Sequence, residues 1–316
     1  MSYTKLLSLI TATTFLFASD SSIYGWNIPE TPMYIGGYVE TLYDETEEES
    51  FLIDDIALLV TANGESFDFL GELEISHLSL NEETNRKITQ LNLERLQLTY
   101  ALGEEEITLG RFNSEIGYWN QTPISIVQET TTYPHIIKHL FPKATTGLML
   151  RSDLEPQSSY RLMMQYNQDI GKVDQSIVSD RHFAMSYYQD YDNFSWTVAT
   201  GLYKDTKGLY ANYAGVGFQH ESDNFMLQGE LFSQKSRGDK SKPYSAYLQP
   251  VWFYDEQQSV VLRLERYKDE EFGADEGIVL LGYSYRPWSN VALKAEYIYH
   301  TQEPLDRFVY SFSVIF

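Results

Sequence analysis

Short segments of alternating apolar and polar residues, separated by brief polar turns, make up most of this 316-residue chain. Alternation is typical of β-strands, because successive side chains point to opposite faces of a strand. Most of the segments have about the 9–11 residues that a tilted strand needs to cross a bilayer. The pattern predicts sixteen strands, near 33–43, 51–62, 66–78, 90–101, 105–113, 145–153, 158–167, 180–190, 193–203, 207–220, 223–233, 243–253, 256–267, 276–286, 289–300 and 306–316.

The last segment separates its two faces clearly. Arg307 and Ser311 share one face, and apolar residues share the other: Phe308, Tyr310, Phe312, Val314 and Phe316. Sixteen such strands carry more apolar faces than one soluble sandwich core of this size needs. A barrel in a membrane satisfies both faces, because its apolar side meets lipid and its polar side meets a watery lumen, with no open edge. The predicted fold class is all-β, a single transmembrane antiparallel β-barrel of about 16 strands.

The predicted connections alternate in length, which fixes how the barrel lies in the membrane. Tight turns such as 62–65 and 190–193 alternate with longer loops such as 79–89 and 114–144. Bacterial barrels have short turns at the periplasmic rim and longer loops outside the cell. An even number of strands then places both chain ends on the periplasmic side.

The N-terminus predicts export. Lys5 is the only charge before an apolar stretch from Leu6 to Phe17, which is the pattern of a signal peptide. We expect a signal peptide over residues 1–22, with cleavage near 18–25, and a barrel over 26–316. Export without a second apolar span predicts localisation in the bacterial outer membrane.

Composition narrows the function further. Aromatic residues make up 15% of the chain, and the net charge is -22. An acidic chain lacks the basic face that a nucleic-acid partner requires. The chain has no cysteine, which excludes disulfides and thiolate metal sites. No apolar run of about 20 residues follows the N-terminus, which excludes a helical membrane protein.

Residues 114–144 form the longest connection and the least periodic one. Connections of this length are usually either functional or disordered. Its apolar residues argue against disorder: Trp119, Tyr133, Ile136, Ile137, Leu140 and Phe141. We predict that this third loop folds into the lumen and narrows the pore. The alternative is a packed surface loop or a lid.

Two local sequences carry a resemblance to a known family. The chain ends in FVYSFSVIF, with Phe316 last, and the third loop begins with LGRF at 109–112 and IGYWN at 116–120. The chain resembles the bacterial outer-membrane porins, and the loop junction resembles those of the phosphate-selective type. The resemblance implies a homotrimer and a role for Phe316 as the signal read by the barrel assembly machinery. The third loop offers only Lys138 and Lys143, whereas a phosphate channel has a lysine cluster.

Strand parity, that is, whether a residue falls on the apolar or the polar face of its alternating segment, assigns charged side chains to the lumen. The first three strands contribute acidic residues: Glu40, Asp55, Asp68, Glu72 and Glu74. Basic residues follow on strands four to seven: Arg95, Arg151 and Arg161. Arg111 lies at the mouth of the third loop, where alternation does not decide its face, and we include it among the charges of the constriction. Later strands carry the mixed pairs Arg263 with Glu265 and Lys294 with Glu296. Grouping by sign would produce a field across the pore. The alternative is a set of paired salt bridges that only make the wall hydrophilic.

No catalytic or metal-binding motif is present. His135 and His139 would align only on a helix, and no carboxylate lies near them in the sequence. We therefore expect no enzyme activity, no cofactor and no metal. The predicted function is passive diffusion of small hydrophilic solutes and ions through an outer-membrane porin, with a weak cation preference and membrane lipid around it. The alternatives are a closed structural or adhesive barrel, an outer-membrane enzyme, and a small-anion channel.

Overall fold

The computed structural model describes residues 25–45, 51–79, 89–122, 124–155, 157–171, 177–236, 243–269, 274–302 and 304–316. The predicted signal peptide lies outside these residues. Within the described ranges, none of the helices is both long enough and apolar enough to cross a membrane.

The described residues form seventeen strands in one sheet. Sixteen of them correspond to the sixteen predicted strands, with bounds that differ by a few residues. The strands are β1 (Trp26–Asn27), β2 (Met33–Asp44), β3 (Phe51–Asn63), β4 (Phe67–Ser79), β5 (Gln90–Leu102), β6 (Glu105–Asn113), β7 (Ala144–Glu155), β8 (Ser158–Gln165), β9 (Ser179–Tyr191), β10 (Phe194–Asp205), β11 (Tyr210–Ser222), β12 (Phe225–Ser236), β13 (Tyr244–Phe253), β14 (Gln258–Asp269), β15 (Ala274–Trp288), β16 (Val291–His300) and β17 (Arg307–Ile315).

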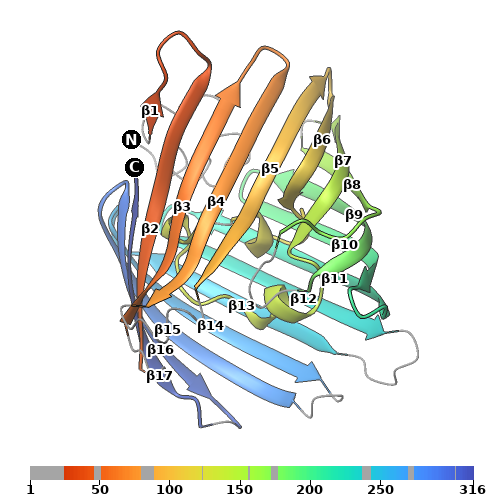
Figure 1. Ribbon diagram of the computed structural model, residues 1–316. Coiled ribbons are helices and arrows are strands. Elements are labelled where there is room, and N and C mark those ends of the chain that lie inside the picture. The colour runs from red at the N-terminus through yellow and green to blue at the C-terminus, as the bar shows by residue number, and fades with distance from the viewer. Residues whose placement is uncertain are drawn as a thin grey trace.

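The sheet closes on itself as an antiparallel barrel (Figure 1). Each strand from β2 to β17 pairs with its neighbours in sequence, and β17 closes the barrel by pairing with β2 from Asp44 to Tyr38. The short strand β1 was not predicted. It pairs with β2 at Ile35 and Tyr34, beyond the point where β17 ends. Both terminal segments therefore share one partner strand.

The outer face of the barrel is apolar. In β17, Phe308, Tyr310 and Phe312 are exposed, whereas Ser311 and Ser313 are buried on the inner side. The same alternation recurs on the other long strands. The predicted division into a lipid-facing side and a lumen side is therefore confirmed, and it follows from the inability of hydrocarbon to solvate polar groups.

Two of the register shifts in the described ladders are β-bulges that affect lumen charges. A register shift in the β2–β3 ladder leaves Asp54 as an extra residue beside Asp55. A shift in the β4–β5 ladder likewise leaves Glu94 beside Arg95. A bulge re-aims the extra side chain, so each pair of consecutive charged residues lies on the inner side of the barrel.

The connection between β6 and β7 lies inside the barrel, as predicted (Figure 1). It contains two 3-10 helices, η1 (Trp119–Gln121) and η2 (Ser125–Val127), and the α-helix α4 (His135–His139). We call residues 114–143 the constriction loop.

Apolar contacts hold the constriction loop against two parts of the wall. On one side the Phe141 ring lies 5.1 Å from that of Phe232 and 5.8 Å from that of Tyr213. On the other side Ile124 and Ile126 join a cluster formed by residues of β2, β3, β16 and β17. Burying apolar area stabilises this position by about 25 cal/mol per Å².

Candidate functional site: the lumen and its constriction loop

Three glutamates on the barrel wall accept hydrogen bonds from the backbone of the constriction loop. Glu230 of β12 accepts from the backbone N–H groups of Tyr118 and Trp119, at 3.1 and 2.9 Å. Glu265 of β14 accepts from the N–H of His135 at 3.0 Å. The third is Glu296 of β16, which accepts from the N–H groups of two threonines. Each carboxylate satisfies loop donors that would otherwise be buried without a partner.

Glu296 of β16 binds the middle of the loop. Its carboxylate accepts from the N–H groups of Thr131 and Thr132, and from the Thr132 hydroxyl at 2.7 Å. Thr131 also hydrogen-bonds Ser311 of β17 at 2.5 Å. The loop is therefore fixed at points spread around the barrel.

A glycine makes the Glu230 contact possible. Gly117 has a φ of +68°, a conformation that residues with a Cβ rarely adopt. A Cβ at this position would also lie 2.0 Å from a carboxylate oxygen of Glu230. The missing side chain thus lets the carboxylate reach the two N–H groups that follow.

Basic residues on β14, β15 and β16 bind loop oxygens. Arg263 donates to the Thr130 hydroxyl and to the Thr132 carbonyl, both at 2.8 Å. Arg286 donates to the Gln128 carbonyl at 2.8 Å, and Lys294 donates to the carbonyl of Ser125. Arg263 and Lys294 were predicted as lumen charges. They do lie inside the barrel, where their charges hold the loop. Arg286 was not singled out, although it lies two residues from the buried Ser284.

Each of the four arginines predicted near the constriction is paired with a carboxylate. Arg95 contacts Glu72, and Arg161 contacts Glu115 of the constriction loop. Arg151 lies 3.8 Å from Glu106.

Arg111 is completely buried, with its Nε 2.9 Å from Asp169 in the connection between β8 and β9. It donates a further hydrogen bond to the Glu94 carbonyl. The arginines therefore form local pairs, which favours the paired-bridge interpretation over an unopposed basic wall.

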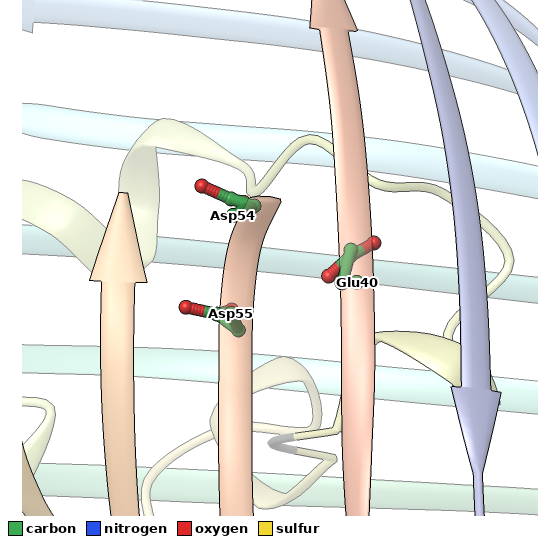
Figure 2. Close-up of side chains that lie close together, drawn as sticks. All are labelled: Glu40, Asp54 and Asp55. Atoms are coloured by element: carbon green, nitrogen blue, oxygen red, sulfur yellow. The ribbon is translucent and has the colours of Figure 1, made fainter. Parts of the chain in front are cut away.

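Acidic side chains gather on the wall formed by β2 to β5. Oxygens of Glu40, Asp54 and Asp55 lie within 4.8 Å of one another, and Figure 2 shows both aspartates pointing to the same side of β3. Next to them, Glu72 and Glu74 share the one proton of the Tyr38 hydroxyl, whose oxygen lies 2.9 Å from an oxygen of each carboxylate. We call Glu40, Asp54, Asp55, Glu72, Glu74 and Glu94 the acidic wall.

Sequence parity identified four members of the acidic wall and missed Asp54 and Glu94, because both are bulge residues. No feature of the sequence marks these bulges apart from two charged residues in succession. Asp68 was also predicted as a lumen charge. It shares the face of Glu72 and Glu74 on β4 and lies at the exposed end of that strand, beside the turn at 64–66.

The constriction loop presents Tyr133 and Lys143 toward the acidic wall. Burial, and then the negative charges of Asp55, Glu40 and Glu74, raise the pKa of Tyr133 well above its usual range. The phenol therefore stays neutral at physiological pH. The Lys143 amine lies 5.2 Å from the centre of the Tyr133 ring and is the basic group that the loop contributes here.

The two loop histidines lie on α4 and do align, as expected if the loop is helical there. Their rings are 5.8 Å apart, and both lie against Tyr267 of β14. The expectation that no carboxylate lies near them holds only along the sequence. In the fold Glu265 approaches the His135 ring to 3.5 Å.

Comparison with known proteins identifies the class of fold. No protein-family model and no curated protein sequence matches the chain. Among solved structures it is similar to an anion-selective porin from Comamonas acidovorans, with 14% identity, a TM-score of 0.67 and coverage of 91% of this chain and 100% of that one. It is also similar to the outer membrane channel DcaP of Acinetobacter baumannii, with 11% identity, a TM-score of 0.63 and coverage of 93% and 100%.

A third similar structure is the trimer form of OmpT, an outer membrane protein of Vibrio cholerae. It shares 10% identity with a TM-score of 0.65, over 90% of this chain and 99% of that one. The chain thus has the fold of the bacterial outer-membrane porins, a sixteen-stranded barrel with a third loop in its lumen. At sequence identities of 10–14%, the similarity to these structures shows the fold alone.

Proposed function

We propose that the chain is a porin of the bacterial outer membrane, through which small hydrophilic solutes and ions diffuse passively with a weak preference for cations. The observation that carries this proposal is the difference between the basic and the acidic side chains inside the barrel. Arg263, Arg286 and Lys294 bind the constriction loop, and Arg95, Arg111, Arg151 and Arg161 pair with carboxylates. Glu72 and Glu94 of the acidic wall belong to these pairs, and its remaining carboxylates then give a negative charge to the part of the lumen that the loop leaves.

The size of the pore depends on the constriction loop. Its buried apolar residues pack on the wall as a protein core does, and this observation favours a narrow passage. The same packing would also suit a closed structural or adhesive barrel, which is therefore the second candidate. The Comamonas relative is described as anion-selective, so a small-anion channel is the third.

Single-channel recording in planar bilayers separates these candidates. We expect frequent, uniform conductance steps from the purified barrel, with a reversal potential in a KCl gradient that indicates a small excess of cation flux. An absence of steps from correctly folded protein would support the closed barrel. A reversal potential of the opposite sign would support the anion channel.

Assembly and processing complete the proposal. The likeness to an outer membrane protein in trimer form supports a homotrimer. The N-terminal pattern supports removal of a signal peptide within residues 18–25, and the terminal Phe316 supports recognition by the barrel assembly machinery. Chemistry on the solute, a cofactor and a metal form no part of the proposed function.

A further inference from the structure

A cavity of about 320 Å³ lies inside the barrel on the side of the short turns. Its lining includes Gln157 and Ser158 at the turn between β7 and β8, and Phe253 at the end of β13. The constriction loop covers it with Tyr118 and Trp119. Its volume is at the lower end of the range of about 300–1,000 Å³ that small-molecule sites occupy.

Neutral amide side chains are the largest single group in the polar lining. Seven glutamines reach the cavity, from the constriction loop and from β9, β11, β12, β13 and the β7–β8 turn: Gln121, Gln128, Gln157, Gln189, Gln219, Gln228 and Gln249. An amide both donates and accepts hydrogen bonds, as does a sugar hydroxyl. Tyr118, Trp119 and Tyr188 supply aromatic surface in the same cavity.

Three lining residues carry buried polar atoms that have no hydrogen-bond partner among the described residues. They are the amide oxygens of Gln128 and Gln249 and the indole Nε1 of Trp119. Gln249 is 1% exposed, and the other two are 5% exposed. Leaving such a group unpaired costs about 1–3 kcal/mol, so a ligand whose hydroxyls reached these atoms would gain by pairing them.

Six charged side chains also line the cavity. Asp153, Glu155 and Asp190 are exposed at its rim, and Arg151 lies 3.8 Å from Glu106. The other two, Arg161 and Glu129, lie deeper and are paired. Arg161 contacts Glu115, and its guanidinium carbon lies 4.0 Å from the centre of the Tyr188 ring. Glu129 contacts Arg286 at 3.0 Å. A charged ligand would have to break one of these pairs, which a neutral ligand leaves in place.

From these features we propose that the cavity binds a neutral polyhydroxylated solute, a mono- or disaccharide. Amide groups and the indole N–H bind its hydroxyls, and the aromatic side chains contact its apolar C–H surface. The inference rests on the proposed porin function only for the route by which the sugar reaches the cavity. Binding itself requires the folded barrel alone.

The test is ligand binding to the purified barrel in detergent, followed by saturation-transfer NMR. The probes are D-glucose and sucrose, with gluconate and glucosamine as charged counterparts of glucose. We expect saturable binding of at least one neutral sugar, with weaker binding of both charged ones. Absence of saturable binding of glucose and sucrose, or equal binding of gluconate or glucosamine, would overturn the proposal.

Substitutions assign the binding to this cavity. Gln249→Leu and Gln128→Leu each remove one amide at nearly constant volume, and each should weaken sugar binding about 3- to 10-fold. Gln97→Leu is the matched control, because Gln97 of β5 is not among the lining residues. If the buried Gln249→Leu variant does not fold, Gln128→Leu on the loop decides the test. Equal weakening by the control would contradict the site.

Conductance recorded on the same preparation keeps the two proposals separate. An ion-conducting barrel that binds neither sugar overturns the site and leaves the porin function intact. A barrel that binds sugar but gives no conductance steps overturns the porin function and leaves the site intact.

Discussion

At the residue scale, the inner face of the barrel is set by alternation together with its local exceptions. Parity placed Glu40, Glu72 and Glu74 correctly inside, because one strand face must be apolar in lipid. It missed Asp54 and Glu94, since a bulge depends on pairing with the next strand and leaves little trace in the sequence. Parity also says nothing of burial, so it could not show that Arg111 is removed from the lumen.

Arg111→Ala should therefore reduce stability more than it changes ion selection. The substitution leaves Asp169 and Glu94 without their buried cationic partner. Breaking a buried pair costs about 3–5 kcal/mol, so thermal unfolding in detergent should begin at a lower temperature. Arg266→Ala, which removes an exposed arginine paired with Asp275, is the control and should change the unfolding temperature little. A changed reversal potential with unchanged stability would contradict this expectation.

Gly117→Ala tests whether the contact between Glu230 and the constriction loop holds the loop in place. An L-residue in the left-handed region costs about 1–2 kcal/mol, and the new methyl group would displace the Glu230 carboxylate. We expect the barrel to fold, with larger current fluctuations in single-channel records because one end of the loop is released. Gly71→Ala is the control, since a Cβ there would meet its nearest atom at 3.4 Å. Identical current noise in both variants would argue against this attachment.

At the element scale, strands and loop differ in how far the sequence determines them. The strands could be predicted almost completely, because lipid imposes one apolar face on every strand. The lumen location of the loop followed from its length and its apolar residues. Its path could not be predicted, since partners such as Thr131 and Glu296 are 165 residues apart and nothing local indicates their contact.

Deletion of residues 120–138 should raise the single-channel conductance without unfolding the barrel. The deleted segment includes most of η1, all of η2 and most of α4, and it supplies the partners of Arg263, Arg286 and Lys294. Water entering the wider lumen would solvate these side chains, and the strand ladder would remain closed. Heat-dependent mobility on gels checks the fold, and planar bilayers measure the conductance. An equal conductance before and after deletion would show that the loop does not limit flow.

At the scale of the whole molecule, the first described strand, β1, and the C-terminal strand, β17, both pair with β2 and complete the closure. The Phe316 backbone exchanges hydrogen bonds with Gly37 at 2.8 and 2.9 Å. Its ring lies 6.0 Å from that of Trp26, the first residue of β1. The C-terminal residue thus joins the two segments that pair with the same edge of β2.

Deletion of Phe316 should lower the fraction of heat-modifiable, folded protein in the outer membrane. The deletion removes the two backbone hydrogen bonds between Phe316 and Gly37 of β2. It also removes the aromatic ring that we expect the assembly machinery to recognise. Phe316→Tyr, which keeps the ring and the backbone, is the control and should assemble normally. Unchanged assembly of the shortened chain would exclude both roles.

Ion preference depends on the charge of the whole lumen. The wall of β2 to β5 gathers carboxylates, whereas the lumen arginines are paired or bind the loop. We expect a weak cation preference that falls from 0.1 to 1 M salt, as the screening length shortens from about 10 to 3 Å. The double substitution Asp54→Asn and Asp55→Asn should reduce it, whereas Glu104→Gln in an exposed turn should not. Reversal potentials in KCl gradients measure the preference. A clear anion preference in the unmodified barrel would show that the paired arginines still govern the pore.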